Sequence, residues 1–113
     1  MGISTHILDT TKGKPASGVL VRLYRRAPSG SWNELSSMLT DQDGRCAHLL
    51  PDTEKLSEGE YRLDFDTAAY YSAQRVNGLY PAVQIPFYVR AGEAHFHIPL
   101  LLSPNGYTTY RGS

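Results

Sequence analysis

One stretch near the end of the chain, residues 95–102, constrains the fold most because its residues alternate between two faces. Successive side chains of a strand point to opposite faces, so this pattern predicts a strand with one buried face. The predicted buried residues are Phe96, Ile98, Leu100 and Leu102. Residues 103–106 then read Ser-Pro-Asn-Gly, which is typical of a tight turn. A second strand over 107–111 completes a predicted β-hairpin.

Similar alternation recurs along the chain and predicts about eight short strands. Their expected ranges are 3–10, 18–26, 32–39, 45–50, 61–65, 83–89, 95–102 and 107–111. A short helix over 67–74 is predicted after Asp66, because aspartate caps helix N-termini. Pro86 lacks an amide hydrogen, which favours an edge position for its strand. Short strands separated by turns predict an all-β fold, a β-sandwich of two antiparallel sheets.

Length and charge limit the possible organisation and partners. The 113 residues predict a single domain, 1–113. Lysine plus arginine number 11 and aspartate plus glutamate also number 11, so nucleic acid and membranes are not expected as partners. Cys46 is the single cysteine, which excludes an intramolecular disulfide and favours a cytoplasmic location. No signal peptide or membrane-spanning stretch is visible.

Two histidines are candidates for acid–base chemistry. His6 and His97 lie on the sides of their strands opposite the apolar residues, so both are expected to face outward. Imidazoles on one sheet face can exchange protons near neutral pH. The commoner role for a histidine in a small protein is a solvated or hydrogen-bonded surface residue, and this alternative stays open.

Other polar residues add to this hypothesis. Arg45 follows an Asp-Gly turn and is expected at a rim of the sandwich, where such a residue is ordinarily solvated. Tyr110, Arg111 and Ser113 follow the last predicted strand, where terminal residues usually carry no such combination. The set suggests a pocket at the C-terminal end.

Alternative chemistries have weaker support. His95 and His97 point the same way, but a zinc site needs three or four ligands, so no metal or other cofactor is expected and zinc stays an alternative. Cys46 in a strand more often packs as a small apolar residue than reacts. Ser113 lacks the Gly-x-Ser-x-Gly context of a nucleophilic serine.

Five motifs are distributed along the chain: Thr-His-Ile-Leu-Asp at 5–9, Gly-Lys-Pro-Ala at 13–16, Asp-Gly-Arg-Cys at 43–46, His-Ile-Pro-Leu-Leu-Leu-Ser-Pro at 97–104 and Tyr-Arg-Gly-Ser at 110–113. Together they resemble the transthyretin-like family of 5-hydroxyisourate hydrolases. The resemblance covers essentially the whole chain, and the terminal tetrapeptide is its most specific part. One departure is Ala82 after Tyr80-Pro81, where the family often has an acidic residue.

The resemblance implies a transthyretin-like sandwich of two four-stranded antiparallel sheets with one short helix. It also implies a homotetramer, a dimer of dimers, with sites in a channel at the dimer–dimer interface. The residues expected to line that channel are His6, Leu8, His97, Pro99, Leu101, Thr108 and Tyr110.

The resemblance also implies an activity, the hydrolysis of 5-hydroxyisourate in urate degradation. His6 and His97 are then expected to activate a water without a covalent intermediate. The residues expected to bind the substrate are Arg45, Tyr110, Arg111 and Ser113. Two alternatives remain, a non-enzymatic carrier of a small ligand and a structural interaction domain.

Overall fold

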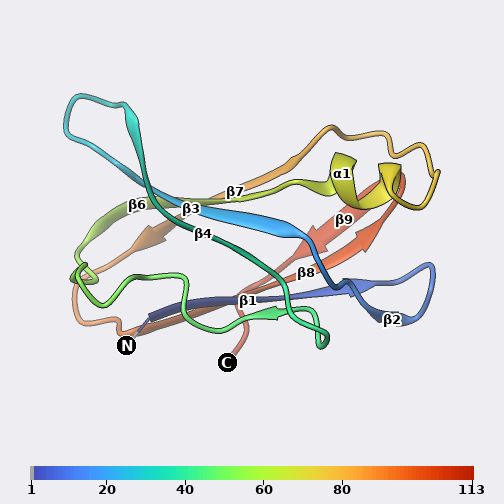
Figure 1. Ribbon diagram of the computed structural model, residues 1–113. Coiled ribbons are helices and arrows are strands. Elements are labelled where there is room, and N and C mark those ends of the chain that lie inside the picture. Colours follow the sequence, from blue (N-terminus) through green and yellow to red (C-terminus); the bar gives the residue numbers. More distant parts are fainter. Residues whose placement is uncertain (1) are drawn as a thin grey trace.

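The computed structural model describes residues 2–113, and within them the chain forms two packed sheets and one helix (Figure 1). Met1, the first residue of the expected 1–113 domain, lies outside the described residues. The first sheet contains β1 (Gly2–Asp9), β2 (Lys14–Pro15), β5 (Arg45–Cys46), β8 (His95–Ser103) and β9 (Gly106–Thr109). The second sheet contains β3 (Leu20–Arg26), β4 (Trp32–Leu39), β6 (Gly59–Phe65) and β7 (Val83–Val89).

The predicted sandwich with a short helix is confirmed, but the first sheet differs from the expectation in two details. It has five strands instead of four, in the order β2-β1-β8-β9 with β5 also paired to β1. In addition, β1 and β8 run parallel, whereas all other pairs are antiparallel. Alternation has the same period in either direction, so it cannot reveal strand direction. Strands of two residues, such as β2 and β5, are too short to show alternation at all.

The core lies between the two sheets and follows the predicted alternation. On β1, Ile3 and Ile7 are at most 1% exposed while their sequence neighbours are half-buried. On β8 the four predicted apolar residues are all buried. The second sheet contributes another row from β3 and β6, namely Val21, Leu23, Leu63 and Phe65. Burial of each such side chain contributes about 1.5–3 kcal/mol, so this interior fixes which face of each sheet stays outside.

The edge strands and the terminal hairpin occur where the sequence predicts them. The second sheet has the order β4-β3-β6-β7, so Pro86 does lie on an edge strand. The hairpin joins β8 to β9 through Pro104 and Asn105, with Ser103 opposite Gly106. The last strand ends at Thr109, earlier than expected. Residues 110–113 therefore form a short tail beyond it.

The helix α1 (Thr67–Ser72) begins with the predicted cap, because the Asp66 side chain accepts a hydrogen bond from the Ala69 amide at 3.2 Å. Its C-terminal end has an unusual residue. Arg75 adopts a φ of 59°, and the Val76 amide donates to the Tyr71 carbonyl at 3.0 Å. This is the Schellman ending, in which glycine is the usual left-handed residue. None of the described helices is long and apolar enough to cross a membrane.

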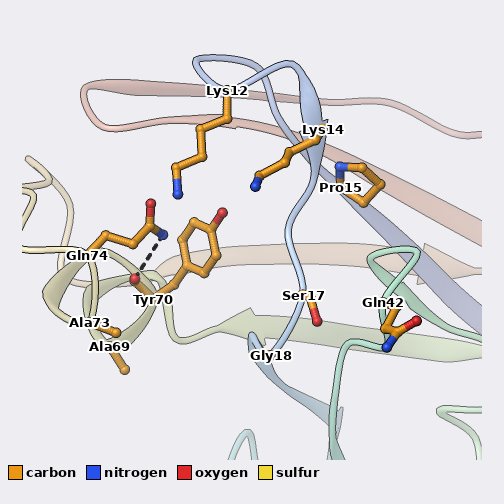
Figure 2. Close-up of a pocket in the computed structure, with 10 residues that line it drawn as sticks. All are labelled: Lys12, Lys14, Pro15, Ser17, Gly18, Gln42, Ala69, Tyr70, Ala73 and Gln74. Atoms are coloured by element: carbon orange, nitrogen blue, oxygen red, sulfur yellow. Dashed lines mark hydrogen bonds between the residues drawn. The ribbon is translucent and has the colours of Figure 1, made fainter.

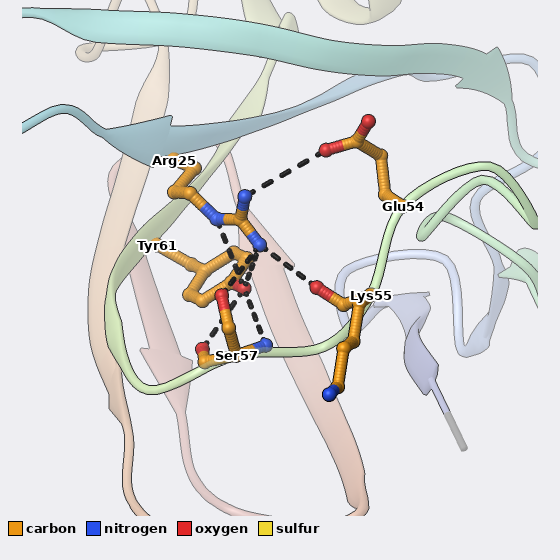
Figure 3. Close-up of polar contacts among 5 residues, drawn as sticks. All are labelled: Arg25, Glu54, Lys55, Ser57 and Tyr61. Carbon is orange, nitrogen blue, oxygen red and sulfur yellow. Dashed lines mark hydrogen bonds and ion pairs between the residues drawn. The ribbon is translucent and has the colours of Figure 1, made fainter.

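A buried tyrosine holds the long loop that joins β5 to β6 (Figure 3). The Tyr61 hydroxyl donates to the Ser57 carbonyl at 3.0 Å and accepts from Arg25 Nη2 at 2.8 Å. Arg25 also donates to the Lys55 carbonyl at 2.8 Å. Burial raises the pKa of Tyr61, but the hydrogen bonds from Ser57 and Arg25 bring it below its ordinary value. These contacts fix the end of the loop that adjoins β6 to the second sheet.

Candidate active site

Strand register brings the predicted imidazoles and guanidinium together on the outer face of the first sheet. His6 on β1 pairs with Arg45 on β5 and with Pro99 on β8. The neighbouring row pairs Ser4 with His97. Because residues 4 and 6 share one face of a strand, these side chains lie opposite the buried Ile3 and Ile7. The outward orientation predicted for His6 and His97 is confirmed.

The C-terminal tail closes one side of this group. After β9 the tail runs back to β8, where the Gly112 amide donates to the His97 carbonyl at 2.8 Å. Figure 1 shows the C-terminus ending beside β1 and β8. A pocket of about 510 Å³ is formed here. Its lining includes Arg45, Ala47, His48, His95, His97 and Ser113.

The environment of His97 favours the uncharged imidazole. Partial burial lowers its pKa below the ordinary value of 6.5, and the nearby positive charges of Arg45 and His6 lower it further. At neutral pH the ring therefore retains a lone pair that can accept a proton. This is the state required of a general base.

Arg45 supplies the donors for an anion at the same pocket. Its guanidinium makes no ion pair or hydrogen bond with any other side chain among residues 2–113, whereas its backbone amide donates to Asp41 Oδ1 at 3.0 Å. The turn therefore fixes the backbone and leaves the side chain available. A guanidinium offers a planar fork of donors that matches carboxylates and other oxyanions.

Three of the predicted residues do not line this pocket. His6 adjoins it through its pairing with Arg45 but is not part of the lining, and the other two lie elsewhere in the described chain. Tyr110 and Arg111 line a smaller apolar groove of about 230 Å³, next to Phe87, Phe96 and Ile98. Arg111 Nη1 donates to Glu93 Oε2 at 2.6 Å, and its guanidinium lies 4.5 Å from the centre of the Phe96 ring. The hydrogen bond from Arg111 keeps the Glu93 pKa below its ordinary value. Within one protomer, Arg111 anchors the tail, and its predicted contact with substrate stays a prediction.

From the sequence alone, no catalytic or substrate-binding role was assigned to four residues that complete this pocket. Ser4 contacts His97, Gly112 packs against it, and His48 and His95 contribute to the lining. Ser4 shares a strand face with His6, and His95 shares one with His97, so period-2 spacing contained a signal for both. Residues 47 and 48 follow a two-residue strand and gave no such signal.

A second pocket of about 500 Å³ lies between the β1–β2 turn and α1 and differs in chemistry (Figure 2). Lys12, Lys14, Tyr70 and Gln74 line it, and Gln74 Nε2 donates to the Tyr70 carbonyl at 3.1 Å. None of the predicted site residues contributes to it. Across residues 2–113, moreover, no group of three or more His, Cys, Asp or Glu side chains has an arrangement that could hold a metal ion. The pocket lined by His97 and Arg45 is therefore the candidate active site.

Comparison with known proteins now decides the family. The model of the HIUase/transthyretin family matches residues 3–112. The chain belongs to this family. Among its members, a 5-hydroxyisourate hydrolase of Mus musculus is 45% identical, and the match covers 98% of this chain and 94% of the relative. A 5-hydroxyisourate hydrolase of Halalkalibacterium halodurans is 40% identical, with 98% of this chain and 97% of the relative covered.

Solved structures from the family confirm the fold and include two functional types. The 5-hydroxyisourate hydrolase of Klebsiella pneumoniae superposes with a TM-score of 0.86 and 35% identity, covering both chains completely. Sea bream transthyretin in complex with thyroxine superposes with a TM-score of 0.92 and 30% identity, covering 99% of this chain and 95% of that one. Because a hydrolase and a transthyretin in complex with thyroxine share the fold, function must be argued from the site.

Proposed function

We propose that this chain hydrolyses 5-hydroxyisourate in urate degradation. One observation carries the proposal: an imidazole with a lowered pKa shares a pocket with the C-terminal tail and with a guanidinium that has no side-chain partner among residues 2–113. The relatives named as 5-hydroxyisourate hydrolases match over nearly their whole length, which favours an enzyme over a carrier. A ligand carrier needs no group poised to accept a proton.

The reaction requires a base and a stabilised oxyanion. A water loses one proton to an imidazole while its oxygen bonds to an amide carbonyl carbon of the ring. The carbonyl oxygen becomes an oxyanion, which then re-forms the carbonyl as the ring C–N bond breaks. The imidazolium returns its proton to the departing nitrogen, so water is added overall and the ring opens. The expected product is 2-oxo-4-hydroxy-4-carboxy-5-ureidoimidazoline.

The residues receive distinct roles in this proposal. His97 and His6 orient and deprotonate the water, which typically accelerates a reaction about 10²–10⁴-fold. Arg45 donates hydrogen bonds to the anionic ring or the developing oxyanion. Ser113, which lines the same pocket, donates a hydrogen bond to the substrate. Tyr110 and Arg111 act on substrate in this proposal only if assembly presents them to a pocket, because in the protomer they line a different groove.

Assembly into a homotetramer, a dimer of dimers, is part of the proposal. The outermost strands β7 and β9 leave one side of each sheet without a neighbouring strand, and an unpaired edge can pair with a second copy. Half-buried Leu8 and Leu101 adjoin each other on the outer face of the first sheet, which suits an interface over the pocket. The expected cytoplasmic location rests on the single cysteine and stays a prediction.

The activity is tested by adding the protein to urate and urate oxidase and following the ultraviolet absorbance of the intermediate. We expect the wild type to accelerate its decay well above the spontaneous rate. His97→Gln should slow the catalysed decay about 10²–10⁴-fold, since the base is lost. Arg26→Gln, a change on the second sheet, is the matched control and should retain activity.

Unchanged decay with folded wild-type protein would contradict the enzyme and favour the carrier. Light scattering of the same sample measures the assembly, and a monomer at working concentration would contradict the tetramer. If the site does form between subunits, dilution below the assembly range should reduce the activity per chain.

A further inference from the structure

The ring of His97 is held at one of its two nitrogens. Ser4 and His97 are direct partners in the parallel pairing of β1 with β8, and Ser4 Oγ lies 2.8 Å from His97 Nδ1. His97 Nε2 makes no hydrogen bond within residues 2–113, and the side chain lines the pocket. One nitrogen is therefore engaged by the protein and the other is left for a ligand or water.

The ring edge is confined by the C-terminal tail. A Cβ built on Gly112 would lie 2.6 Å from His97 Cδ2, closer than Cβ atoms approach other atoms in proteins, and 3.2 Å from Pro99 Cγ, which is a tight contact. Gly112 does not adopt a positive φ, so its backbone conformation alone does not demand glycine. The close approach of residue 112 to the His97 ring is what requires glycine there. Residue 112 must lack a side chain for the tail to reach its hydrogen bond with the His97 carbonyl.

We propose that Ser4 and Gly112 are positioning residues that hold His97 with its proton on Nδ1 and its Nε2 lone pair open to the pocket. Which of the two imidazole nitrogens carries the proton is set by the hydrogen bond that the other nitrogen, the one not acting on the ligand, makes. A base acting through Nε2 needs the proton on Nδ1, where Ser4 Oγ accepts it. This assignment rests on the proposed hydrolysis, because it fixes which nitrogen acts.

The charged groups around His97 control its charge, which is a separate matter from its orientation. Arg45 on β5 and His6 on β1, the strand between β5 and β8, both act against a positive ring. His48 and His95 complete the titratable side chains that line the pocket with it. Ser4 carries no charge, so replacing it should change the proton position and the rate more than the charge.

The first test compares Ser4→Ala with Ser4→Thr. Nitrogen-15 NMR of the His97 ring, recorded where the imidazole is neutral, reports which nitrogen holds the proton. We expect Nδ1–H in the wild type, a mixture in Ser4→Ala, and recovery of Nδ1–H in Ser4→Thr, which retains a hydroxyl. In the decay assay Ser4→Ala should lower kcat roughly three- to tenfold with little change in KM, as expected for one lost hydrogen bond.

The second test compares Gly112→Ala with Gly106→Ala, a matched control at the start of β9. At Gly106 a Cβ would meet only Ser103 Oγ at 3.8 Å, an ordinary contact. We expect Gly112→Ala to move the His97 ring resonances and lower kcat at least as much as Ser4→Ala, while Gly106→Ala changes neither. Thermal unfolding of each variant shows whether the fold is retained.

Either of two results would overturn the assignment: a wild-type ring protonated mainly at Nε2, or a proton position that Ser4→Ala leaves unchanged. Loss of activity in Ser4→Thr equal to that in Ser4→Ala would also contradict it, because the hydroxyl would then not be the active feature. The NMR result stands without turnover. If the wild type lacked hydrolase activity, the proposed function would fail while the positioning of His97 would still be decided.

Discussion

The two sheets bury similar rows of apolar residues, but the charged side chains on their outer faces differ in whether they are paired. On the outer face of the second sheet, Arg62 binds Asp64 at 2.6 Å and Arg26 binds Glu60 at 3.2 Å. Arg62 also lies 4.6 Å from the centre of the Tyr24 ring. On the outer face of the first sheet, Arg45 has no such partner among residues 2–113 and adjoins two imidazoles.

This difference separates structural charge from functional charge. A guanidinium that is already paired has its donors occupied and contributes modest stability. An unpaired guanidinium beside an imidazole raises the free energy of the imidazolium and gains nothing within the protomer. Such an arrangement is favourable only when an anion completes it, which agrees with a substrate-binding face. The predictions below test this contrast.

The largest expected difference is between Arg45→Gln and Arg26→Gln. Arg45→Gln should lower kcat/KM about 10²–10³-fold, because it removes donors to developing negative charge. The free energy of unfolding should hardly change, or even rise, because a charge that repels the imidazolium is lost. Steady-state kinetics and urea unfolding check both quantities.

Arg26→Gln should show the reverse pattern. It breaks an exposed ion pair, so unfolding should cost about 0.2–1 kcal/mol less, and kcat/KM should equal that of wild type. Equal kinetic losses in the two variants would break the proposed contrast between the sheets.

Tyr61→Phe probes a buried polar contact of the second sheet. Removing the hydroxyl deletes its hydrogen bonds with Arg25 and leaves the Ser57 amide and carbonyl without this partner, so the free energy of unfolding should fall by about 1–3 kcal/mol. Activity of the folded fraction should be retained, because the hydroxyl contacts the end of the loop that adjoins β6 and not the pocket lining. Chemical unfolding monitored by circular dichroism measures the change in stability. A loss of kcat/KM above twofold would show that the loop influences the pocket.

The pH dependence should arise from the first-sheet side, since all four histidines lie on β1, β8 and the segment after β5. With the His97 pKa below 6.5, kcat/KM should be level at neutral pH and fall about tenfold per unit below that pKa. Stability should change in the same direction. Between the folded and unfolded pKa values the unfolded chain binds more protons, so the stability present above pH 6.5 declines as pH falls.

Rate and unfolding measurements from pH 4.5 to 8 check this dependence. An acidic limb with a midpoint above 6.5 would contradict the lowered pKa. In His97→Gln both the limb and this part of the stability change should disappear, whereas Arg26→Gln should retain them.

Much of the fold and part of the site were predictable because they depend on local patterns. Alternation on β1 and β8 predicted that His6 and His97 lie on the solvent-facing sides of their strands, and Asp66 predicted the start of the helix. The parallel pairing of β1 with β8 was not predictable, since two strands separated by the whole intervening chain carry no local signal of direction. The same pairing places Ser4 beside His97, so that contact was out of reach as well.

The tail shows a different limit of sequence reasoning. Residues 110–113 were singled out as a group, yet the structure divides them. Arg111 turns to Glu93 and Phe96, whereas Gly112 lies against His97 and Ser113 enters the pocket lining. Successive residues of an extended chain point to opposite sides, and no pattern in so short a segment states which side meets the sheet.

Another small expected effect lies at the end of α1, away from both outer faces. Arg75 holds a left-handed conformation that costs a residue with a Cβ about 1–2 kcal/mol. Arg75→Gly should remove that cost but add conformational freedom to the unfolded chain, for a net gain of about 0.5–1 kcal/mol. Arg75→Ala is the matched control, because it removes the charge and retains the strain, so it should gain nothing. Thermal unfolding measures both variants, and kcat/KM should match wild type in each. A gain in Arg75→Ala equal to that in Arg75→Gly would attribute the effect to charge instead of backbone, since only glycine relieves a positive φ.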